Sequence, residues 1–314
     1  MRWLKILALL PFVLALPLAA ADETKLTVDV SGLFWTRTAG PTLPLVSLNT
    51  APGSGDVFTT KTVALTTWKP GGDVRLGIGW GQLGAEVRGF MLAKWTRSAL
   101  FTGAGTSLVI ETDPRTSYGL PAGATIAAAN ESRLKGIEAN LTYDLIPAVC
   151  VYAGARYVLI DETFDLFGDF GAGDTEEDIW TVKNKMLGGQ IGVRADILRP
   201  AEGVQRGFTV QARGAFALFS DSASVDFEVV DTAVASAAKR SHISPAVDAG
   251  LRFGYRLDRM IELYIGYDLL WLNAVAQATH QVAGTTAFGL PPTSTLVFNS
   301  FVVHGARAGL TVRF

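Results

Sequence analysis

The sequence predicts an all-β protein, specifically a transmembrane antiparallel up-and-down β-barrel of about 10 strands, with 12 as the alternative. Three observations lead to this prediction. Apolar and polar residues alternate over many segments, no span after residue 21 is long and apolar enough for a membrane helix, and short and long connections alternate along the chain. In lipid, only helices and closed barrels satisfy every backbone N–H and C=O group. An apolar chain without spanning helices is therefore a barrel or, as the alternative, a large soluble β-fold.

The N-terminal segment has the composition of an export signal. Arg2 and Lys5 precede the short apolar stretch Ile6–Leu18, and the small residues Ala19–Ala21 follow it. This order is typical of a cleaved signal peptide, although an uncleaved anchor is the alternative. We expect residues 1–21 to be the signal peptide and residues 22–314 to form an outer-membrane β-barrel domain, which places the protein in the bacterial outer membrane after export.

Composition narrows the choice of partners. Hydrophobic residues make up 49% of the chain and the mean hydropathy is +0.28. Without the signal peptide, 25 basic and 29 acidic residues remain, a formal charge of −4. A mildly acidic protein is a poor partner for nucleic acid. We expect contacts with outer-membrane lipid and lipopolysaccharide instead.

Strand alternation is clearest in Ser241–Arg256. One phase carries apolar residues such as Leu251, Phe253 and Tyr255, and the other carries Asp248 and Arg252. A period of two over about fifteen residues predicts a long strand with one apolar face. The same pattern predicts nine further strands: Val28–Trp35, Asp73–Trp80, Ala85–Trp95, Leu134–Asp144, Val149–Glu162, Val182–Asp196, Phe208–Phe219, Glu262–Trp271 and Gly305–Phe314.

Connection lengths agree with an outer-membrane barrel, in which short turns lie on the periplasmic side and long loops on the other. We expect short turns near residues 81–84, 146–148 and 257–260, and a somewhat longer one near 200–206. Long loops are expected at about 36–72, 98–132, 164–179, 220–240 and 274–300. Both chain ends then lie on the periplasmic side. A hairpin involving Thr59–Trp68 would raise the strand number to twelve.

Aromatic residues are expected at the two membrane interfaces, where their rings meet the lipid headgroups. The outward residues Trp80, Tyr143, Phe208, Tyr255 and Phe314 lie at the short-turn ends of their strands. A second group, expected farther along the same outward faces, contains Trp95, Tyr157, Phe216 and Trp271. The terminal Phe314 is also expected to be the signal for the barrel-assembly machinery.

The inward phases carry charged residues, and these are the candidate site residues. We expect twelve of them to line the lumen: Arg75, Glu86, Arg88, Glu138, Arg156, Arg194, Arg213, Asp248, Arg252, Asp268, Arg307 and Arg313. Lys94, Asp29 and Glu262 are expected inside as well. Charges at membrane depth are costly unless they pair or meet water. They either line a narrow aqueous pore for ions or small polar solutes, or form Arg–carboxylate pairs that fill a small barrel.

Four segments resemble a known family when taken in order. They are Arg156–Glu162 (RYVLIDE), Lys183–Gly192 (KNKMLGGQIG), Gly266–Trp271 (GYDLLW) and Gly305–Phe314 (GARAGLTVRF), with a looser match at Gly32–Trp35 and Leu43–Val46. Together they resemble the β-barrel porin family of outer-membrane proteins best known from planctomycetes. The resemblance implies an outer-membrane barrel with porin function and carries over no catalytic or ligand residue.

Other functional classes have weaker support. An outer-membrane enzyme would need a histidine near a nucleophile, and His242, His280 and His304 are the histidines of the chain. No catalytic motif surrounds them, so we predict no enzyme, and we expect His242 and His280 at the rim to meet water. A third class is a structural or adhesive barrel that binds through loops 98–132 and 274–300.

No metal or cofactor is predicted. Three scattered histidines and Cys150 do not form a zinc site. An acidic segment from Asp161 to Asp178 could bind calcium, but we expect it to be a solvated loop.

Overall fold

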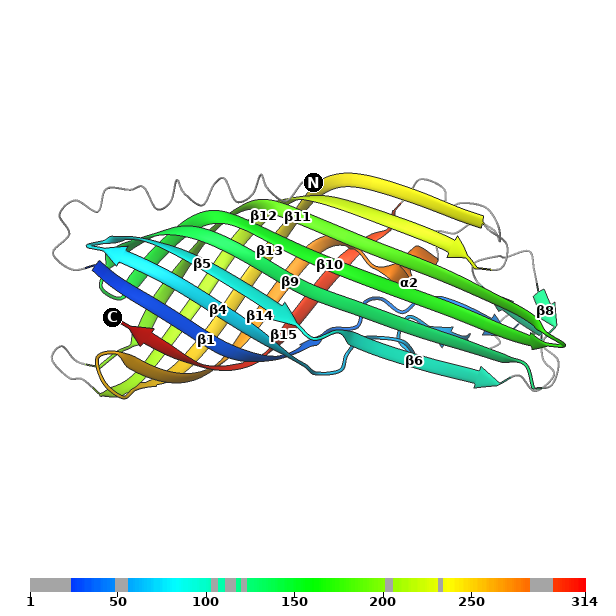
Figure 1. The fold of residues 1–314 in the computed structure, drawn as a ribbon, viewed down its shortest axis with the longest axis horizontal. Helices are drawn as coiled ribbons and strands as arrows, with labels where there is room; N and C mark the ends of the chain where they lie inside the picture. The colour runs from blue at the N-terminus through cyan, green and yellow to red at the C-terminus, as the bar shows by residue number, and fades with distance from the viewer. Residues whose placement is uncertain are drawn as a thin grey trace.

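The computed structural model describes residues 24–48, 56–102, 107–110, 117–119, 123–200, 206–230, 234–282 and 296–314. The expected signal peptide, residues 1–21, lies outside this range. Within it the protein is almost entirely β-structure, as Figure 1 shows. None of the helices in this part of the chain is long and apolar enough to cross a membrane.

Ten antiparallel strands close into a barrel. In chain order they are β1 (Thr24–Arg37), β4 (Lys69–Trp80), β5 (Leu83–Leu92), β9 (Thr125–Ile146), β10 (Val149–Gly171), β11 (Asp174–Leu198), β12 (Gly207–Val229), β13 (Val234–Arg256), β14 (Ile261–Ala276) and β15 (Phe298–Arg313). Each pairs with the next, and β15 pairs with β1. An eleventh strand of this sheet, β6 (Trp95–Thr102), pairs with β9 beyond the end of β5. The predicted fold class, with about ten strands, is confirmed.

The ring closes between the first and last strands. Val30 pairs with Leu310 in the β1–β15 register. Beyond it, Phe314 N donates to Leu26 O at 2.8 Å and Leu26 N donates to Phe314 O at 3.2 Å. Two backbone hydrogen bonds therefore fix the last residue to the barrel wall, and both described ends of the chain lie at the short-turn end (Figure 1).

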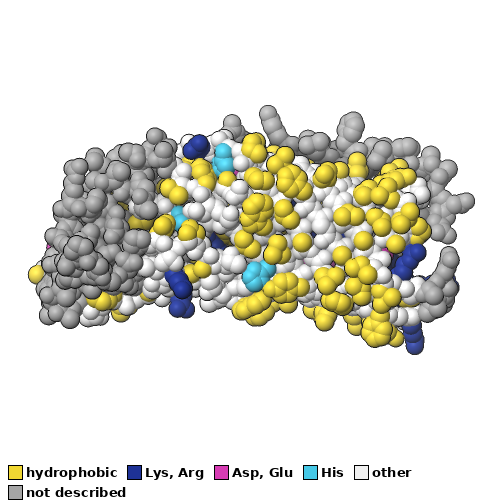
Figure 2. Space-filling view, turned by 180° about the vertical axis from the view of Figure 1, so that it is seen from behind, with side chains coloured by type: hydrophobic (Ala, Val, Ile, Leu, Met, Phe, Trp, Pro, Cys, Tyr) yellow, Lys and Arg dark blue, Asp and Glu magenta, His cyan; other side chains and the backbone are white. Residues whose placement is uncertain are grey.

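The outward face near the short turns is apolar and exposed. Leu187, Ile191, Phe208 and Ile265 are each at least 60% exposed. Figure 2 shows hydrophobic side chains gathered on the half of the barrel toward the short turns. Such a surface is stable in contact with lipid and costs free energy in contact with water. We call this exposed outward face the apolar belt. The predicted girdle residues Tyr143, Phe208, Tyr255 and Phe314 are exposed at its edge.

Four strands, β10 to β13, are 23 to 25 residues long. A membrane-spanning strand needs only about 9–11 residues, so these strands project far beyond the membrane. The predictions of long loops at 164–179 and 220–240 are therefore wrong. A tight turn at Ala172 and Gly173, both with positive φ, joins β10 to β11, and β12 continues to Val229 before β13 begins at Val234.

The strand predicted over Ala85–Trp95 is interrupted. Ala93 and Lys94 belong to neither β5 nor β6, although Ala93 N still donates to Pro70 O of β4 at 2.8 Å. This irregularity changes the phase of the side chains. Trp95 consequently points into the barrel and is fully buried. Lys94 pairs with Glu131 at 2.6 Å, and both side chains are more than a third exposed. The predictions of Trp95 as an outward residue and Lys94 as an inward one are wrong.

The segment Thr60–Trp68 is not a barrel hairpin. It buries Val63 and Leu65 in the interior, where Asn130 Nδ2 donates to Val63 O at 3.1 Å and Trp95 Nε1 donates to Thr67 O at 3.0 Å. The preceding strand β3 (Asp56–Thr59) belongs to a second, four-stranded sheet with β2 (Pro44–Leu48), β7 (Ser107–Ile110) and β8 (Ser117–Gly119).

Candidate functional site in the barrel interior

Strand alternation brings the predicted charged residues together inside the barrel. All twelve candidates lie on inward faces, and ten of them, from β4 to β15, have side chains less than 15% exposed, with Arg194 and Arg313 the more exposed two. Asp29 and Glu262, which were also expected inside, are buried with this group, and the structure adds Asp73. Asp73 did not appear among the expected inward residues, although it shares the phase of Arg75 two residues later on β4. That phase was the available signal.

Eight of these side chains form a closed ring of ion pairs across the lumen. Four arginines alternate with four carboxylates, and each neighbour lies within 4.0 Å, in the order Asp73, Arg88, Glu138, Arg156, Asp248, Arg213, Asp268, Arg307 and back to Asp73. We call this the charged ring. Its shortest contacts are Arg88 Nε to Asp73 Oδ2 at 2.5 Å and Arg307 Nη2 to Asp73 Oδ1 at 3.0 Å.

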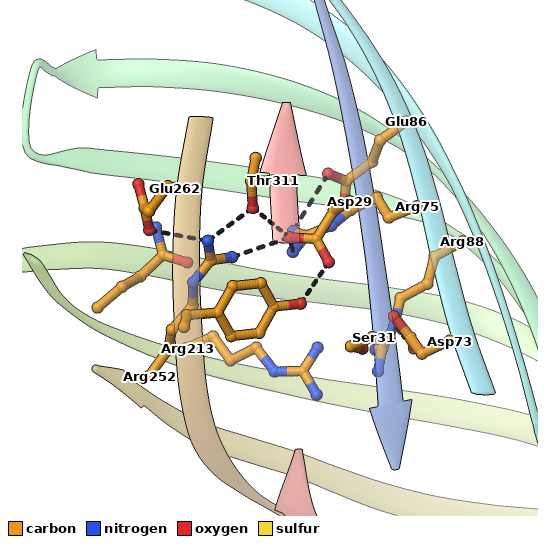
Figure 3. Close-up of polar contacts among 12 residues, drawn as sticks. Asp29, Ser31, Asp73, Arg75, Glu86, Arg88, Arg213, Arg252, Glu262 and Thr311 are labelled. Carbon is orange, nitrogen blue, oxygen red and sulfur yellow. Dashed lines mark hydrogen bonds and ion pairs between the residues drawn. The ribbon is translucent and has the colours of Figure 1, made fainter. Parts of the chain in front are cut away.

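A second set of pairs lies on the short-turn side of the charged ring. Asp29 accepts hydrogen bonds from Arg252 at 2.9 Å, from Tyr264 at 2.5 Å and from Thr311 at 2.7 Å (Figure 3). Arg252 also reaches Glu262 at 2.8 Å. On the other side, Arg75 lies between Asp29 and Glu86, and Glu86 binds Arg194 at 2.5 Å.

Every carboxylate in these two sets has at least two arginines within 4.0 Å. Buried charges are tolerated only when they are paired and hydrogen-bonded. Every charge in the two sets is paired, but single buried atoms, such as Asp268 Oδ2 and the Nε atoms of Arg156 and Arg307, have no hydrogen-bond partner. Neutral side chains add further hydrogen bonds, since Gln190 donates to Glu138 at 2.9 Å and Asn140 donates to Glu86 at 3.1 Å.

Below the network the barrel is open to the short-turn side. A cavity of about 840 Å³ begins there and is lined by Arg75, Glu86, Arg194, Arg252 and Cys150, among others. It has room for many water molecules, and the charged side chains of the network line its inner part. Cys150 is a free thiol on the cavity wall.

Above the charged ring, apolar side chains fill the barrel. Nine of the ten barrel strands contribute inward residues to this set, which we call the apolar layer: Leu33, Trp35, Phe90, Leu92, Leu134, Val158, Ile160, Met186, Ala217, Phe219, Ala246, Leu270, Leu272, Val275, Phe301 and Val303, together with Trp95 of β6 and Leu65. On the tenth strand, a Cβ at Gly71 would lie 2.5 Å from the Leu92 side chain. No member is more than 6% exposed, so water does not reach this level.

Segments that enter the barrel from the outer end are fixed by polar contacts. Arg37 pairs with Glu162 and donates to Gln277 Oε1 at 2.5 Å. Glu162 also accepts from Ala278 N at 2.9 Å, and Asn184 makes two hydrogen bonds to the backbone of Ala276. These contacts hold the short helix α2 (Ala278–Gln281) inside the barrel, where Ala276, Ala278 and Val282 join an upper apolar core.

The histidines and the acidic segment differ from expectation. His280 is 2% exposed and His242 packs on Phe298, with ring centroids 4.1 Å apart, so neither is a solvated rim residue. Of the acidic segment, Glu162 and Asp178 are buried. Among the described residues, no group of His, Cys, Asp and Glu side chains is arranged to hold a metal ion.

The fold and its interior define a transmembrane β-barrel with a filled lumen. No protein-family model matches the chain, and no curated protein matches it. Solved structures that it is similar to include the outer membrane protease OmpT from Escherichia coli (12% identity, TM-score 0.43, 94% of this chain and 98% of that chain). Another is the translocator domain of the autotransporter NalP from Neisseria meningitidis (12% identity, TM-score 0.41, 99% and 94%). A third is the toluene transporter TodX from Pseudomonas putida (12% identity, TM-score 0.33, 94% and 90%).

Proposed function

We propose that this protein is a structural outer-membrane barrel with a closed lumen, whose projecting outer part forms a rigid surface outside the membrane. The apolar layer carries this proposal. Its residues come from nearly every strand and exclude water, so ions and polar solutes would have to cross a desolvated region several residues thick. The narrow charged pore of the porin hypothesis requires a continuous aqueous path, which the apolar layer interrupts.

Residence in the bacterial outer membrane is part of the same proposal. The exposed apolar belt supports it, as do the three longest connections, between β1 and β4, β5 and β9, and β14 and β15, which all lie at the end opposite the short turns. The resemblance to planctomycete porins stays a prediction, and so does recognition of Phe314 by the barrel-assembly machinery. An adhesive role for the projecting part also stays a prediction; the length of β10 to β13 beyond the belt favours it.

Single-channel recording in planar bilayers tests the closed lumen. The folded, purified barrel should give no current steps above those of a detergent blank, because the apolar layer blocks ion passage. Reproducible steps that scale with the amount of protein would reject the proposal and restore the porin hypothesis.

Native Cys150 offers an independent test. It lines the cavity at the short-turn side, and the apolar layer separates it from the outer end. In proteoliposomes of one orientation, a small membrane-impermeant thiol reagent should label Cys150 only when added on the short-turn side. A Cys150→Ser variant is the control for labelling elsewhere. Equal labelling from both sides would contradict a closed lumen.

A further inference from the structure

The outward face of the barrel carries a compact group of cations. Arg133 and Lys135 lie on β9, and Lys183 and Lys185 lie on β11, with β10 between them. In the strand register, Arg133 pairs with Asp161, which pairs with Lys183. In the next outward row, Lys135 pairs with Leu159, which pairs with Lys185. All four cations are exposed. We call them the basic patch.

Strand geometry fixes the size of the basic patch. Neighbouring strands lie about 4.8 Å apart, and outward residues on one strand repeat about every 6.6 Å. The Cα atoms of the four cations therefore lie within an area of roughly 10 by 7 Å. Two or three of these long side chains could contact a single phosphate group from different sides. The four cations of the basic patch together could bind two phosphate groups.

The basic patch lies at the edge of the apolar belt. The next outward residues toward the short turns are Ile137 on β9 and Leu187 on β11, which are 53% and 60% exposed. Acyl chains covering these residues would place their headgroups at the level of the cations. The outer wall is not basic all round, because β14 and β15 carry Asn273 and Ser300 outward at this end, and their side chains hydrogen-bond to each other at 3.3 Å.

The cations of the basic patch differ from those in the lumen in having no carboxylate partner. Among the described residues, none of the four lies within 4.0 Å of a carboxylate oxygen, whereas each arginine of the charged ring contacts two. The nearest acidic positions in register are Asp161, within the patch, and Glu131, one row farther out, which pairs with Lys94. The patch therefore has a net charge of +3 before Glu131 is considered.

We propose that the basic patch binds the phosphorylated headgroup of an outer-leaflet glycolipid of the lipid A type, with the acyl chains lying on the apolar belt below it. Charge complementarity supplies the headgroup contact, since each Lys or Arg near a membrane surface attracts anionic lipid. Continuity with the apolar belt selects a lipid over free phosphate. This inference requires the barrel to sit in a membrane but does not depend on whether the lumen is closed.

Native mass spectrometry of the folded barrel in detergent can count bound lipid. The probes are bisphosphorylated lipid A, the same lipid with both phosphates removed, and inorganic phosphate as competitor. The test variant is Lys183→Gln/Lys185→Gln. Its matched control, Lys61→Gln/Arg259→Gln, removes the same charge from two exposed positions away from the patch. Heat-modifiable migration on gels shows that each variant is folded.

The wild-type protein and the control should retain bisphosphorylated lipid A, and the test variant should bind it at least about tenfold more weakly. The wild-type protein should bind the dephosphorylated lipid as weakly as the test variant binds bisphosphorylated lipid A. Inorganic phosphate at the same concentration as the lipid should not displace bisphosphorylated lipid A from the wild type. Equal affinity of test and control variants would overturn the proposal, as would equal affinity for the dephosphorylated lipid. Arg133→Gln/Lys135→Gln should repeat the loss from the other side of the patch.

Discussion

The two halves of the barrel interior are filled in opposite ways. In the membrane half, inward residues such as Arg88, Glu138 and Asp268 are charged and outward residues are apolar. In the projecting half, Val225, Phe227 and Val229 point inward, while Asp226 and Glu228 lie between them on the outward face. In the same strands, the apolar face is therefore the outward one where lipid surrounds the barrel and the inward one where water surrounds it. The surrounding solvent decides which face of a strand is apolar.

The difference also separates two ways of holding a barrel together. In the membrane half, lipid covers the outward apolar residues, and ion pairs between inward side chains connect the strands across the lumen. The projecting half depends on burial of apolar surface, as a soluble protein does. Substitutions in the two halves should therefore destabilise the protein through different mechanisms.

The largest effect is expected from Arg88→Met. This change leaves Asp73 with Arg307 alone and Glu138 with Arg156 alone, in a site where the Arg88 side chain is only 3% exposed. Removing one partner of a buried ion pair costs about 3–5 kcal/mol. Urea unfolding in lipid vesicles, followed by tryptophan fluorescence, should show a loss of this size.

A second substitution that restores the charge balance provides the control for Arg88→Met. The double variant Arg88→Met/Asp73→Asn leaves three arginines and three carboxylates in alternation from Glu138 to Arg307, so it should recover part of the lost stability, because no excess charge remains buried. A double variant less stable than Arg88→Met alone would show that packing volume, rather than charge pairing, determines the stability of the charged ring.

The apolar layer gives a matched pair on one strand. Phe219 of β12 points inward and is fully buried, whereas Phe216 points outward and is 44% exposed to the membrane side. Phe219→Ala should lower the free energy of unfolding by about 3–4 kcal/mol, since it opens a cavity. Phe216→Ala should cost less, because lipid can fill the space. The same unfolding assay compares them, and equal losses would mean that Phe219 does not pack in a closed core.

A smaller, pH-dependent effect is expected in the projecting half. Asp178 of β11 is 3% exposed, and burial raises its pKa to about 7. Its folded pKa lies above the unfolded value near 3.8, so the folded state retains a proton between these two pH values. The contribution of Asp178 to the free energy of unfolding therefore falls as pH rises from about 4 to 7, and its full penalty is present above pH 7.

Asp178→Asn removes this titration. The variant should match the wild type near pH 4 and exceed its stability at pH 8 by roughly 1–3 kcal/mol, since one pKa unit corresponds to about 1.4 kcal/mol and water entry relaxes part of the penalty. Unfolding curves at both pH values measure the difference. A stability gap that does not change with pH would show that Asp178 ionises freely in the folded protein.

The membrane half could be predicted well from the sequence. The period-two pattern identified the ten strands. It also located the inward arginines and carboxylates, because a residue next to a lipid-facing residue on a strand must point into the lumen. Ring formation could not be predicted, since which arginine meets which carboxylate depends on register and side-chain reach. Asp73 illustrates this: its phase was visible, but its contacts with Arg88 and Arg307 come from three different strands.

The projecting half was predicted poorly for a physical reason. If the apolar phase of every strand faces lipid, segments such as 220–229, whose apolar residues point inward, are predicted to be loops. The signal was present in Val225–Val229, where alternation continues without a break in period. Trp95 was misplaced by a different cause, because the irregularity at Ala93 and Lys94 reverses the phase, and no turn residue marks it.

The smallest effect is expected at the same irregularity. Lys94 and Glu131 form an ion pair at 2.6 Å, but the two side chains are 35% and 42% exposed. Exposed pairs contribute about 0–1 kcal/mol because water screens the charges and two long side chains lose freedom. Lys94→Gln should therefore change the free energy of unfolding by less than about 1 kcal/mol, and 0.5 M salt should remove most of the change. Arg88→Met should keep its effect in the same salt, since the charged ring is buried. If 0.5 M salt reduced the loss of unfolding free energy equally for both variants, solvent ions would have access to the charged ring. The charged ring would then not belong to a closed interior.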